Sequence, residues 1–337
     1  VYPNGEMRDY EAKFYLPFKG VSKPIYAVPG NHDWFNALDG FAANLMRPDA
    51  AQAALTARTN ADLRFSSTNE ARILRLISEA ARLRQYYGIR AGLQRAPFFE
   101  LHTDRFSLIA VDTGILKSVD EREFAWLRAA LDRSKGTFTM AILGHPLYAA
   151  GRYQAEDPRS FQVVHDLLKA HQVPIVMAGD THDFEYYREP GVAGGSPTHH
   201  FVNGGGGAYL SIGTALGFPQ TPALADFAYY PPTDAMHDKL DAETPAWKRP
   251  VWWWVRRFGA WPFVAETLSA IFDFNRAPFF QSFIEVRVEP SANRVRLLLY
   301  GVDGPLRWKD LETGGDLRPT ETAVAEPVEF VVPMNPP

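Results

Sequence analysis

The stretch IYAVPGNHD, residues 25–33, joins a short apolar run to a glycine and then to a cluster of polar side chains. The same pattern recurs at FTMAILGHP, residues 138–146, and at PIVMAGDTHD, residues 174–183. A short apolar run that ends in glycine is typical of a buried strand leaving a sheet. Because α/β folds hold ligands and catalytic groups just beyond strand ends, we expect these three ends to meet at one metal site.

The bulk composition indicates a globular chain with a sizeable core. Its 337 residues are 46% hydrophobic, enough for one large domain or two ordinary ones. The 35 Lys and Arg against 39 Asp and Glu give a net charge of −4, so no overall basic field indicates a nucleic-acid partner. The absence of cysteine excludes disulfides and thiolate metal sites. Histidine, asparagine, aspartate or glutamate must therefore hold any metal.

The amino-terminal residues carry no targeting pattern. The chain opens on Val1 in place of methionine and continues into a turn-like segment, residues 2–5. No run reaches the roughly 18 uninterrupted apolar residues of a spanning helix, since Arg256, Arg257 and Glu266 interrupt the most apolar stretch. We expect a soluble or membrane-peripheral fragment whose amino-terminal part is missing.

Alternating strand-like and helix-like patterns predict a layered α/β domain over residues 1–210. A helical pattern over about residues 38–95 interrupts the alternation, and Ser67 with Glu70 forms a capping box there. We interpret this segment as a helical insertion. Its many arginines are expected on a solvated face, or alternatively on a basic rim that attracts phosphate.

The rest of this domain is expected to continue the alternation. The expected elements are paired strands over 98–111, a helix with Ser118 and Glu121 as its capping box, a strand over 138–143, a helix over 161–172 and a strand over 174–178.

The last part of the chain is less regular. Residues 211–275 are rich in proline and aromatic side chains, which predicts an irregular cover. Aromatic residues within 251–272 fall near one helical face, which favours core or interface packing, or alternatively an interfacial membrane helix. Residues 276–337 are expected to close the domain with a β-hairpin, 283–288 against 294–299, followed by a peripheral tail.

The polar residues at the three strand ends are nitrogen and oxygen donors of intermediate hardness. They suit Zn, Fe or Mn in the +2 or +3 state. Of the nine histidines, His32, His145 and His182 follow a glycine at a strand end. The other six are expected to have ordinary structural roles: His102, His165, His171, His199, His200 and His237.

The order Gly-Asn-His-Asp, then Gly-His, then Gly-x-x-His resembles the carboxy-terminal motif set of calcineurin-like metallophosphoesterases, including the purple acid phosphatase branch. The matching context runs over about residues 1–187. The resemblance implies a layered β-sandwich flanked by helices, amino-terminally truncated and carrying the helical insertion. It also implies hydrolysis of small phosphate esters by a hydroxide that two metal ions activate, with Fe, Mn or Zn as cofactors.

Residue roles follow from the same resemblance. Asn31 and His145 would be ligands of one metal of a binuclear pair. His32 would approach the phosphate without binding metal and would stabilise or protonate the leaving oxygen, while Asp33 would orient His32.

The third motif departs from the family pattern. The family has Gly-His-x-His where this chain has Gly179-Asp180-Thr181-His182, so His182 keeps the ligand position of the other metal and Asp180 replaces a histidine ligand. Two earlier family motifs, an Asp-x-His and a Gly-Asp with a bridging aspartate, have no counterpart before Asn31. The resemblance therefore implies an incomplete site, and we expect this fragment alone to be nearly inactive.

Several functions fit these motifs. A phosphomonoesterase is favoured over a phosphodiesterase or a lipid-linked pyrophosphatase. An alternative of another class is a non-catalytic, metal-containing module that binds a membrane or a protein partner. Peripheral membrane contact would then involve residues 251–272.

Overall fold

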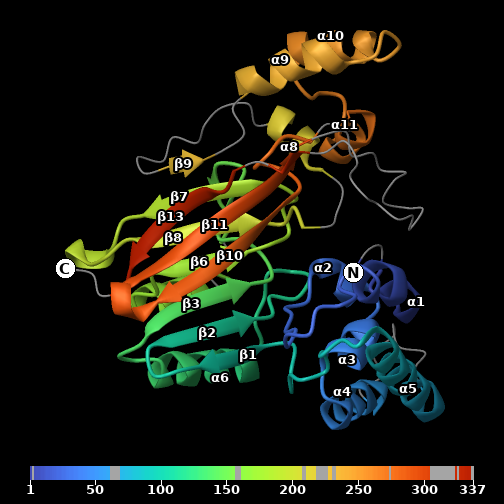
Figure 1. Ribbon diagram of the computed structural model, residues 1–337, viewed down its shortest axis with the longest axis vertical. Helices are drawn as coiled ribbons and strands as arrows, with labels where there is room; N and C mark the ends of the chain where they lie inside the picture. The colour runs from blue at the N-terminus through green and yellow to red at the C-terminus, as the bar shows by residue number, and fades with distance from the viewer. Residues whose placement is uncertain are drawn as a thin grey trace. The chain divides into compact units, whose positions relative to one another are not determined.

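A computed structural model describes residues 1, 4–60, 69–155, 161–206, 210–217, 227–229, 233–272, 275–303, 323–324 and 326–334 (Figure 1). The chain divides into two compact units. The first comprises Val1–His102, Ser107–Arg133 and Ala141–His145, and the second comprises Thr103–Phe106, Ser134–Met140 and Pro146–Pro337. One sheet has the strand order β1-β2-β3-β6-β8-β7-β9, and a four-stranded sheet holds β10, β11, β12 and β13.

Helices dominate the first unit. They are α1 (Met7–Tyr10), the π-helix η1 (Glu11–Tyr15), α2 (Asn31–Phe35), α3 (Asp39–Leu45), α4 (Pro48–Asn60), α5 (Glu70–Tyr87) and α6 (Glu121–Arg133). Strands β1 (Phe99–His102) and β2 (Phe106–Val111) pair antiparallel, as predicted. Helix α6 flanks this pair, because the Trp126 ring packs on Phe98 at 4.6 Å and Arg133 forms an ion pair with Glu100 at 2.6 Å.

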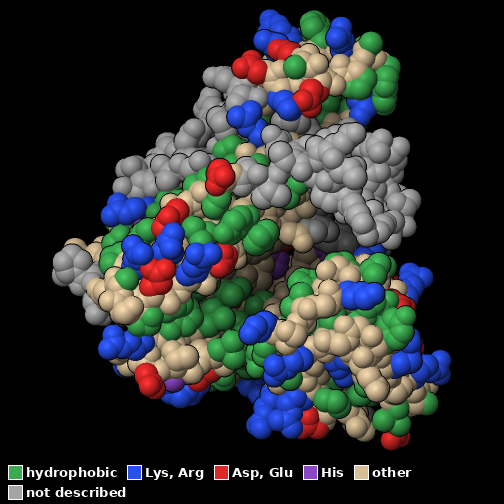
Figure 2. All heavy atoms as spheres, viewed as in Figure 1, with side chains coloured by type: hydrophobic (Ala, Val, Ile, Leu, Met, Phe, Trp, Pro, Cys, Tyr) green, Lys and Arg blue, Asp and Glu red, His purple; other side chains and the backbone are tan. Residues whose placement is uncertain are grey.

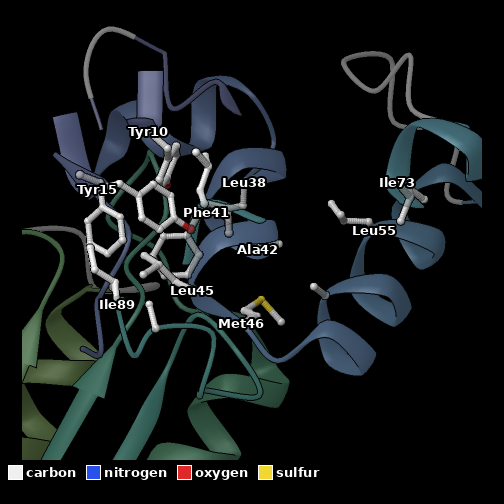
Figure 3. Packing of buried hydrophobic residues seen from close by; sticks show 14 residues of the cluster. Tyr10, Tyr15, Leu38, Phe41, Ala42, Leu45, Met46, Leu55, Ile73 and Ile89 are labelled. Carbon is white, nitrogen blue, oxygen red and sulfur yellow. The ribbon is translucent and has the colours of Figure 1, made fainter. Parts of the chain in front are cut away.

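The first unit has its own apolar core, which includes Tyr10, Tyr15, Leu38 and Phe41 (Figure 3). The side chains come from α1, η1, α3, α4 and α5, so the helices predicted between residues 38 and 95 pack on the amino-terminal helices. Tyr15 is fully buried, and its hydroxyl donates to Asn44 Oδ1 at 2.7 Å. This bond satisfies a polar group that burial would otherwise leave costly.

Two helices begin later than their predicted capping boxes. The cap of α5 is Asn69, whose Oδ1 accepts from Arg72 N at 2.9 Å; Ser67 lies outside the described residues. The cap of α6 is Asp120, whose Oδ1 accepts from Glu123 N at 2.7 Å. Asn and Asp satisfy an orphan amide at a helix start as well as Ser does, and here they stand closer to the apolar stripe.

The first apolar run is not a strand, which corrects the expectation for residues 25–28. Its backbone instead bonds to the segment after α5: Ile25 N donates to Arg90 O at 2.9 Å, and Ala27 N donates to Gln94 Oε1 at 3.1 Å. The Gln94 side chain also donates to Ala27 O at 3.0 Å. A side-chain amide thus takes the place that a neighbouring strand would occupy.

The second unit is a sandwich of two sheets with a helix on one side. Strand β6 (Ile175–Ala178) runs parallel to β8 (Thr198–Asn203), and β7 (Phe184–Glu189) is antiparallel to both β8 and β9 (Phe227–Tyr229). The second sheet pairs β10 (Ser282–Glu289) with β11 (Arg294–Asp303), and β11 with β12 (Ala323–Val324) and β13 (Val328–Pro333). Strand β3 (Phe138–Leu143) matches its predicted range, and a small hairpin joins β4 (Tyr148–Ala149) to β5 (Arg152–Tyr153).

Alternation along β7 and β8 sends side chains to opposite faces. On one face Phe330 of β13 packs against Tyr186 and Phe201, at ring distances of 4.8 and 5.2 Å. On the other face His165 of helix α7 (Phe161–Ala170) bonds to Glu189. The predicted layered α/β sandwich with flanking helices is confirmed. The tail after residue 320 is not peripheral, however, since β13 completes the second sheet; much of that tail lies outside the described residues.

The aromatic segment contains two helices and not one. Helix α10 (Arg249–Phe258) ends at Gly259, and α11 (Ala265–Ile271) follows after a turn that holds Pro262, which cannot continue a helix. They pack with α8 (Ile212–Gly217) and α9 (Thr233–Glu243) around a small core that includes Trp252, Val255 and Leu268. The prolines expected to break residues 218–232 lie outside the described residues. In the described parts of the chain, no helix combines the length and apolar character needed to cross a bilayer.

Candidate metal centre

The first motif forms the start of α2 in the first unit. Gly30 precedes the helix, and the amide of Gly30 donates to Asp33 Oδ2 at 3.1 Å while Asp33 N donates to Gly30 O at 3.1 Å. Asn31 Oδ1 accepts from His32 N at 2.8 Å. These bonds close a tight turn, which fixes the backbone at Asn31 and His32.

Asp33 ties this turn to the core of the first unit. It is buried, and its Oδ1 accepts from the Tyr10 hydroxyl at 3.2 Å. Burial and the charge of Asp33 raise the pKa of Tyr10 well above its ordinary value, so Tyr10 remains a donor. Tyr10 lies in the apolar cluster of Figure 3. The polar motif is therefore anchored to the apolar core of the first unit.

The second motif belongs to the same unit. His145 is buried, and its Nδ1 lies 2.7 Å from Thr113 Oγ1. A Cβ added to Gly144 would lie 2.7 Å from Thr113 Oγ1 and 3.2 Å from Pro29 O. Glycine at this position therefore allows the backbone before His145 to approach the backbone before Asn31.

The turn after β2, residues 112–114, contacts both the first and the second motif, although it was not predicted from the sequence as part of the site. Asp112 Oδ1 accepts from Trp34 Nε1 of α2 at 3.0 Å and from Gly114 N at 2.9 Å, while Thr113 contacts His145. The sequence did contain a signal for this turn: Asp112, Thr113 and Gly114 directly follow an apolar strand, as polar residues and glycine follow the apolar runs of the three motifs. If His145 were to bind a metal through Nε2, its Nδ1 would carry a proton. Thr113 Oγ1 lies where it can accept the hydrogen bond from that Nδ1–H group.

A buried carboxyl group lies behind this turn and gives a pH prediction. Glu123 Oε1 accepts from Asp112 N at 2.8 Å. Burial, with the charge of Asp112, raises the pKa of Glu123 from 4.5 to about 8. The folded state then binds more protons than the unfolded state between these values, so the free energy of unfolding falls as the pH rises through this range.

The variant Glu123→Gln keeps the acceptor oxygen and removes this titration. We expect it to be more stable than the unchanged protein by about 1–3 kcal/mol at pH 8, with little difference at pH 4. Thermal unfolding at pH 4, 6 and 8 measures the effect. Parallel pH profiles for the two proteins would show that Glu123 titrates normally.

The third motif belongs to the second unit, between β6 and β7. Asp180 is exposed and has φ of +71°, a left-handed conformation that Asp and His adopt more readily than most residues. His182 is buried, and its amide donates to Ser211 Oγ at 3.0 Å. The backbone at position 180 therefore accepts either the Asp present here or the His of the family pattern.

The glycine run after β8 supports this motif. A Cβ added to Gly204 would lie 2.1 Å from Thr181 O and 3.3 Å from Asp180 N. The nearest atom to a Cβ at Gly206 is Ser282 O at 3.7 Å, an ordinary contact. A side chain at position 204 would therefore clash with the backbone of the third motif, whereas a methyl group at position 206 would fit.

We expect Gly204→Ala to destabilise the protein by about 1–3 kcal/mol, because the turn that holds Asp180 and His182 must shift. Gly206→Ala is the matched control and should change stability by less than about 0.5 kcal/mol. Urea unfolding of both variants provides the comparison. Equal effects would mean that the close approach at Gly204 does not constrain the turn.

A further polar cluster in the second unit joins α7 to β7 and β8. Glu189 Oε2 accepts from Nε2 of His165 at 2.8 Å and from Nε2 of His200 at 2.9 Å, and its Oε1 bonds to Lys169 Nζ at 2.6 Å. The two histidines and Glu189 offer ligand-type atoms within 4.8 Å of one another, which by type could hold a metal ion. Both histidines had been assigned ordinary structural roles.

The hydrogen bonds favour an ion-pair network at this cluster. Burial acts to raise the pKa of the Glu189 carboxyl group. The hydrogen bonds from His165, His200 and Lys169 outweigh burial and hold this pKa far below its usual range. The carboxylate is thus already neutralised by an ammonium group, which would also repel a metal cation. We interpret the cluster as a structural connection between helix and sheet.

Substitution separates the two interpretations. Glu189→Gln should lower the free energy of unfolding by about 1–3 kcal/mol, since the half-buried Lys169 ammonium and the buried ring nitrogens of His165 and His200 lose their carboxylate acceptor. Glu243→Gln, which removes the exposed pair with Lys239 (2.6 Å), should cost at most about 1 kcal/mol. Metal content by mass spectrometry should be equal in both variants. Selective loss of metal from Glu189→Gln would make the cluster a metal site.

Comparison with known proteins places the chain in a family. Residues 2–184 match the sequence profile described as calcineurin-like phosphoesterase (Metallophos). Because the match covers more than half of the chain, the protein belongs to the calcineurin-like phosphoesterase family. The family is described as one of phosphoesterases, the class of enzymes that hydrolyse phosphate esters. No curated protein sequence matches the chain.

Two solved structures show low similarity. One is the purple acid phosphatase PPD1 from yellow lupin (Lupinus luteus) seeds, at 13% identity over 67% of this chain and 34% of that chain, with a TM-score of 0.34. The other is PhoD, at 10% identity over 97% of this chain and 68% of that chain, with a TM-score of 0.40. The chain thus spans about a third of the length of the purple acid phosphatase.

Proposed function

We propose that the protein hydrolyses phosphate monoesters at a centre of two metal ions, Fe, Mn or Zn. Asn31 and His145 are proposed as ligands of one ion, Asp180 takes the place of a histidine ligand, and His182 is proposed as a ligand of the other ion. The observation that carries the proposal is the approach of the first two motifs: a Cβ at Gly144 would lie 3.2 Å from Pro29 O, so the turns before Asn31 and His145 adjoin. An amide oxygen and an imidazole whose other nitrogen is fixed by Thr113 are suitable donors for these metals.

The chain's own residues provide orientation and proton transfer. Bound metal ions would supply Lewis acidity and lower the pKa of a water molecule. His32, at the start of α2, is proposed to give a proton to the leaving oxygen, a role suited to an imidazole near neutral pH. Asp33 is proposed to orient His32 by fixing the backbone turn that carries it, because the Asp33 carboxylate accepts a hydrogen bond from the Gly30 amide.

Asp180 is proposed as a ligand that changes metal preference. A carboxylate brings a negative charge where the family pattern has a neutral imidazole, which favours a harder or more highly charged ion. Asp180→His should therefore shift relative occupancy toward zinc.

The test combines metal analysis with a substrate panel. The purified protein is assayed with 4-nitrophenyl phosphate, bis(4-nitrophenyl) phosphate and a lipid-linked pyrophosphate, and its metals are counted by mass spectrometry. Fastest turnover of the monoester with bound metal supports the proposal. Faster diester or pyrophosphate hydrolysis would overturn the substrate class. Complete absence of turnover at saturating metal, without even the trace rate expected of these 337 residues, would make the protein a binding module. Because the 337 residues contain no Asp-x-His or Gly-Asp motif before Asn31, we expect low metal affinity and compare variants as ratios.

A further inference from the structure

An exposed aromatic cluster lies on α10 and the turn that follows it. Trp253 is 61% exposed, Phe258 is 52% exposed and Trp261 is 74% exposed. The Phe258 ring lies 4.7 Å from that of Trp254 and 6.0 Å from that of Trp253, and Trp254 Nε1 donates to Trp261 O at 2.7 Å. The four residues therefore form one connected cluster.

The opposite face of α10 is already occupied. Trp252 and Val255 are buried in the small core with Leu268, and Trp252 Nε1 donates to Asp241 Oδ1 at 2.7 Å. A surface helix with one apolar face in the core normally has a polar outer face. Here the outer face carries large aromatic side chains, so the core of the second unit does not account for them.

The charge around the cluster is positive. Residues 244–265 contain Lys248, Arg249, Arg256 and Arg257 and no Asp or Glu, in a chain whose net charge is −4. Arg256 pairs with Asp241, whereas Arg257 lies over the Phe258 ring at 5.5 Å and Lys248 over the Trp247 ring at 5.0 Å. Trp247 is itself 77% exposed. In Figure 2 hydrophobic and basic side chains lie next to one another at the place of α9 and α10, together with some acidic side chains.

We infer that residues 247–261 form a docking surface for the anionic surface of a phospholipid membrane. Tryptophan and phenylalanine partition into the interface between headgroups and acyl chains, and neighbouring Lys and Arg attract anionic lipid. A protein partner would need a complementary acidic and apolar surface, whereas an anionic bilayer offers both properties over any area. Docking does not depend on the metal centre and can fail or succeed independently of the proposed hydrolysis.

Vesicle co-sedimentation tests the docking surface. The unchanged protein should bind vesicles of phosphatidylcholine with 30% phosphatidylglycerol at low salt and bind pure phosphatidylcholine at least tenfold more weakly. The triple variant Trp253→Ala, Phe258→Ala, Trp261→Ala should lose at least tenfold in affinity for the anionic vesicles. The matched control is Phe283→Ala with Val331→Ala, which removes exposed apolar groups from β10 and β13 (57% and 50% exposed) and should bind as before.

A charge variant provides a second measurement. Arg249→Gln with Arg257→Gln should bind about 25-fold more weakly, at roughly fivefold per basic residue near an anionic surface. Hydrolysis of a soluble ester should be unchanged in every variant. Absence of vesicle binding by the unchanged protein, or equal loss in the control, would overturn the inference. So would a dimer in analytical ultracentrifugation that the triple variant abolishes, because a second copy would then occupy the surface.

Discussion

Replacement of His32 by alanine is expected to lower kcat by about 10²–10⁴-fold and to leave the metal content unchanged. His32 is the second residue of α2, and its ring packs edge-on against Phe35 at 4.7 Å. The preceding Asn31 is a proposed ligand, so His32 emerges from the same turn without being needed to hold metal. A group so placed can transfer a proton to an ester oxygen as the bond to phosphorus breaks.

The leaving group provides a sharper measurement than the rate alone. 4-Nitrophenolate leaves readily without a proton, whereas the alkoxide of glycerol phosphate needs one. The variant should therefore lose more activity on glycerol phosphate than on 4-nitrophenyl phosphate. His171→Ala, the same substitution beyond the end of α7, should behave as the unchanged protein on both esters. Equal losses on the two esters would exclude a proton-transfer role, and loss of metal would make His32 a ligand.

Much of the fold could be predicted because its strands carry local patterns. Strand β3 has its predicted limits. The paired strands β1 and β2, the strand β6 and the hairpin of β10 and β11 lie within four residues of theirs. Strand β13 was missed because it is stabilised by pairing with β11, which lies 29 to 39 residues earlier in the chain, through contacts such as Val332 opposite Val295. Residues 25–28 were misassigned because Gln94, far along the chain, takes the place of a neighbouring strand.

The proposed site divides in the same way. Asn31, His32, His145 and His182 could be proposed as site residues from a local pattern, an apolar run followed by glycine and ligand-type side chains, although the first of these runs, residues 25–28, is not a strand. Their supports could not. Thr113 contacts His145 across 32 positions, and Gly204 approaches the third motif only once β8 has been placed beside β6. Contacts of this kind depend on the tertiary structure and leave no local pattern.

Replacement of His145 by alanine is expected to lower the bound metal by one ion per chain and kcat/KM by at least about 10³-fold. His145 is buried, so the missing imidazole leaves a gap that a water molecule fills only as a weaker ligand. Metal titration followed by mass spectrometry measures the stoichiometry. A full complement of metal in this variant would remove His145 from the ligand set.

Thr113→Val tests whether the hydroxyl group holds the imidazole in position. Valine has nearly the same shape but cannot accept the proton on Nδ1 of His145, 2.7 Å away, so the ring loses its fixed orientation and part of its basicity. Metal affinity should fall about 10–100-fold with the ion still bound at saturation. Thr139→Val is the matched control, because Thr139 is also buried but its hydroxyl makes only a 3.5 Å contact with Thr137 O. Equal metal affinities in the two valine variants would mean that Thr113 packs against His145 without positioning it, and the support of the proposed ligand would then lie in the approach of Gly144 to Pro29 alone.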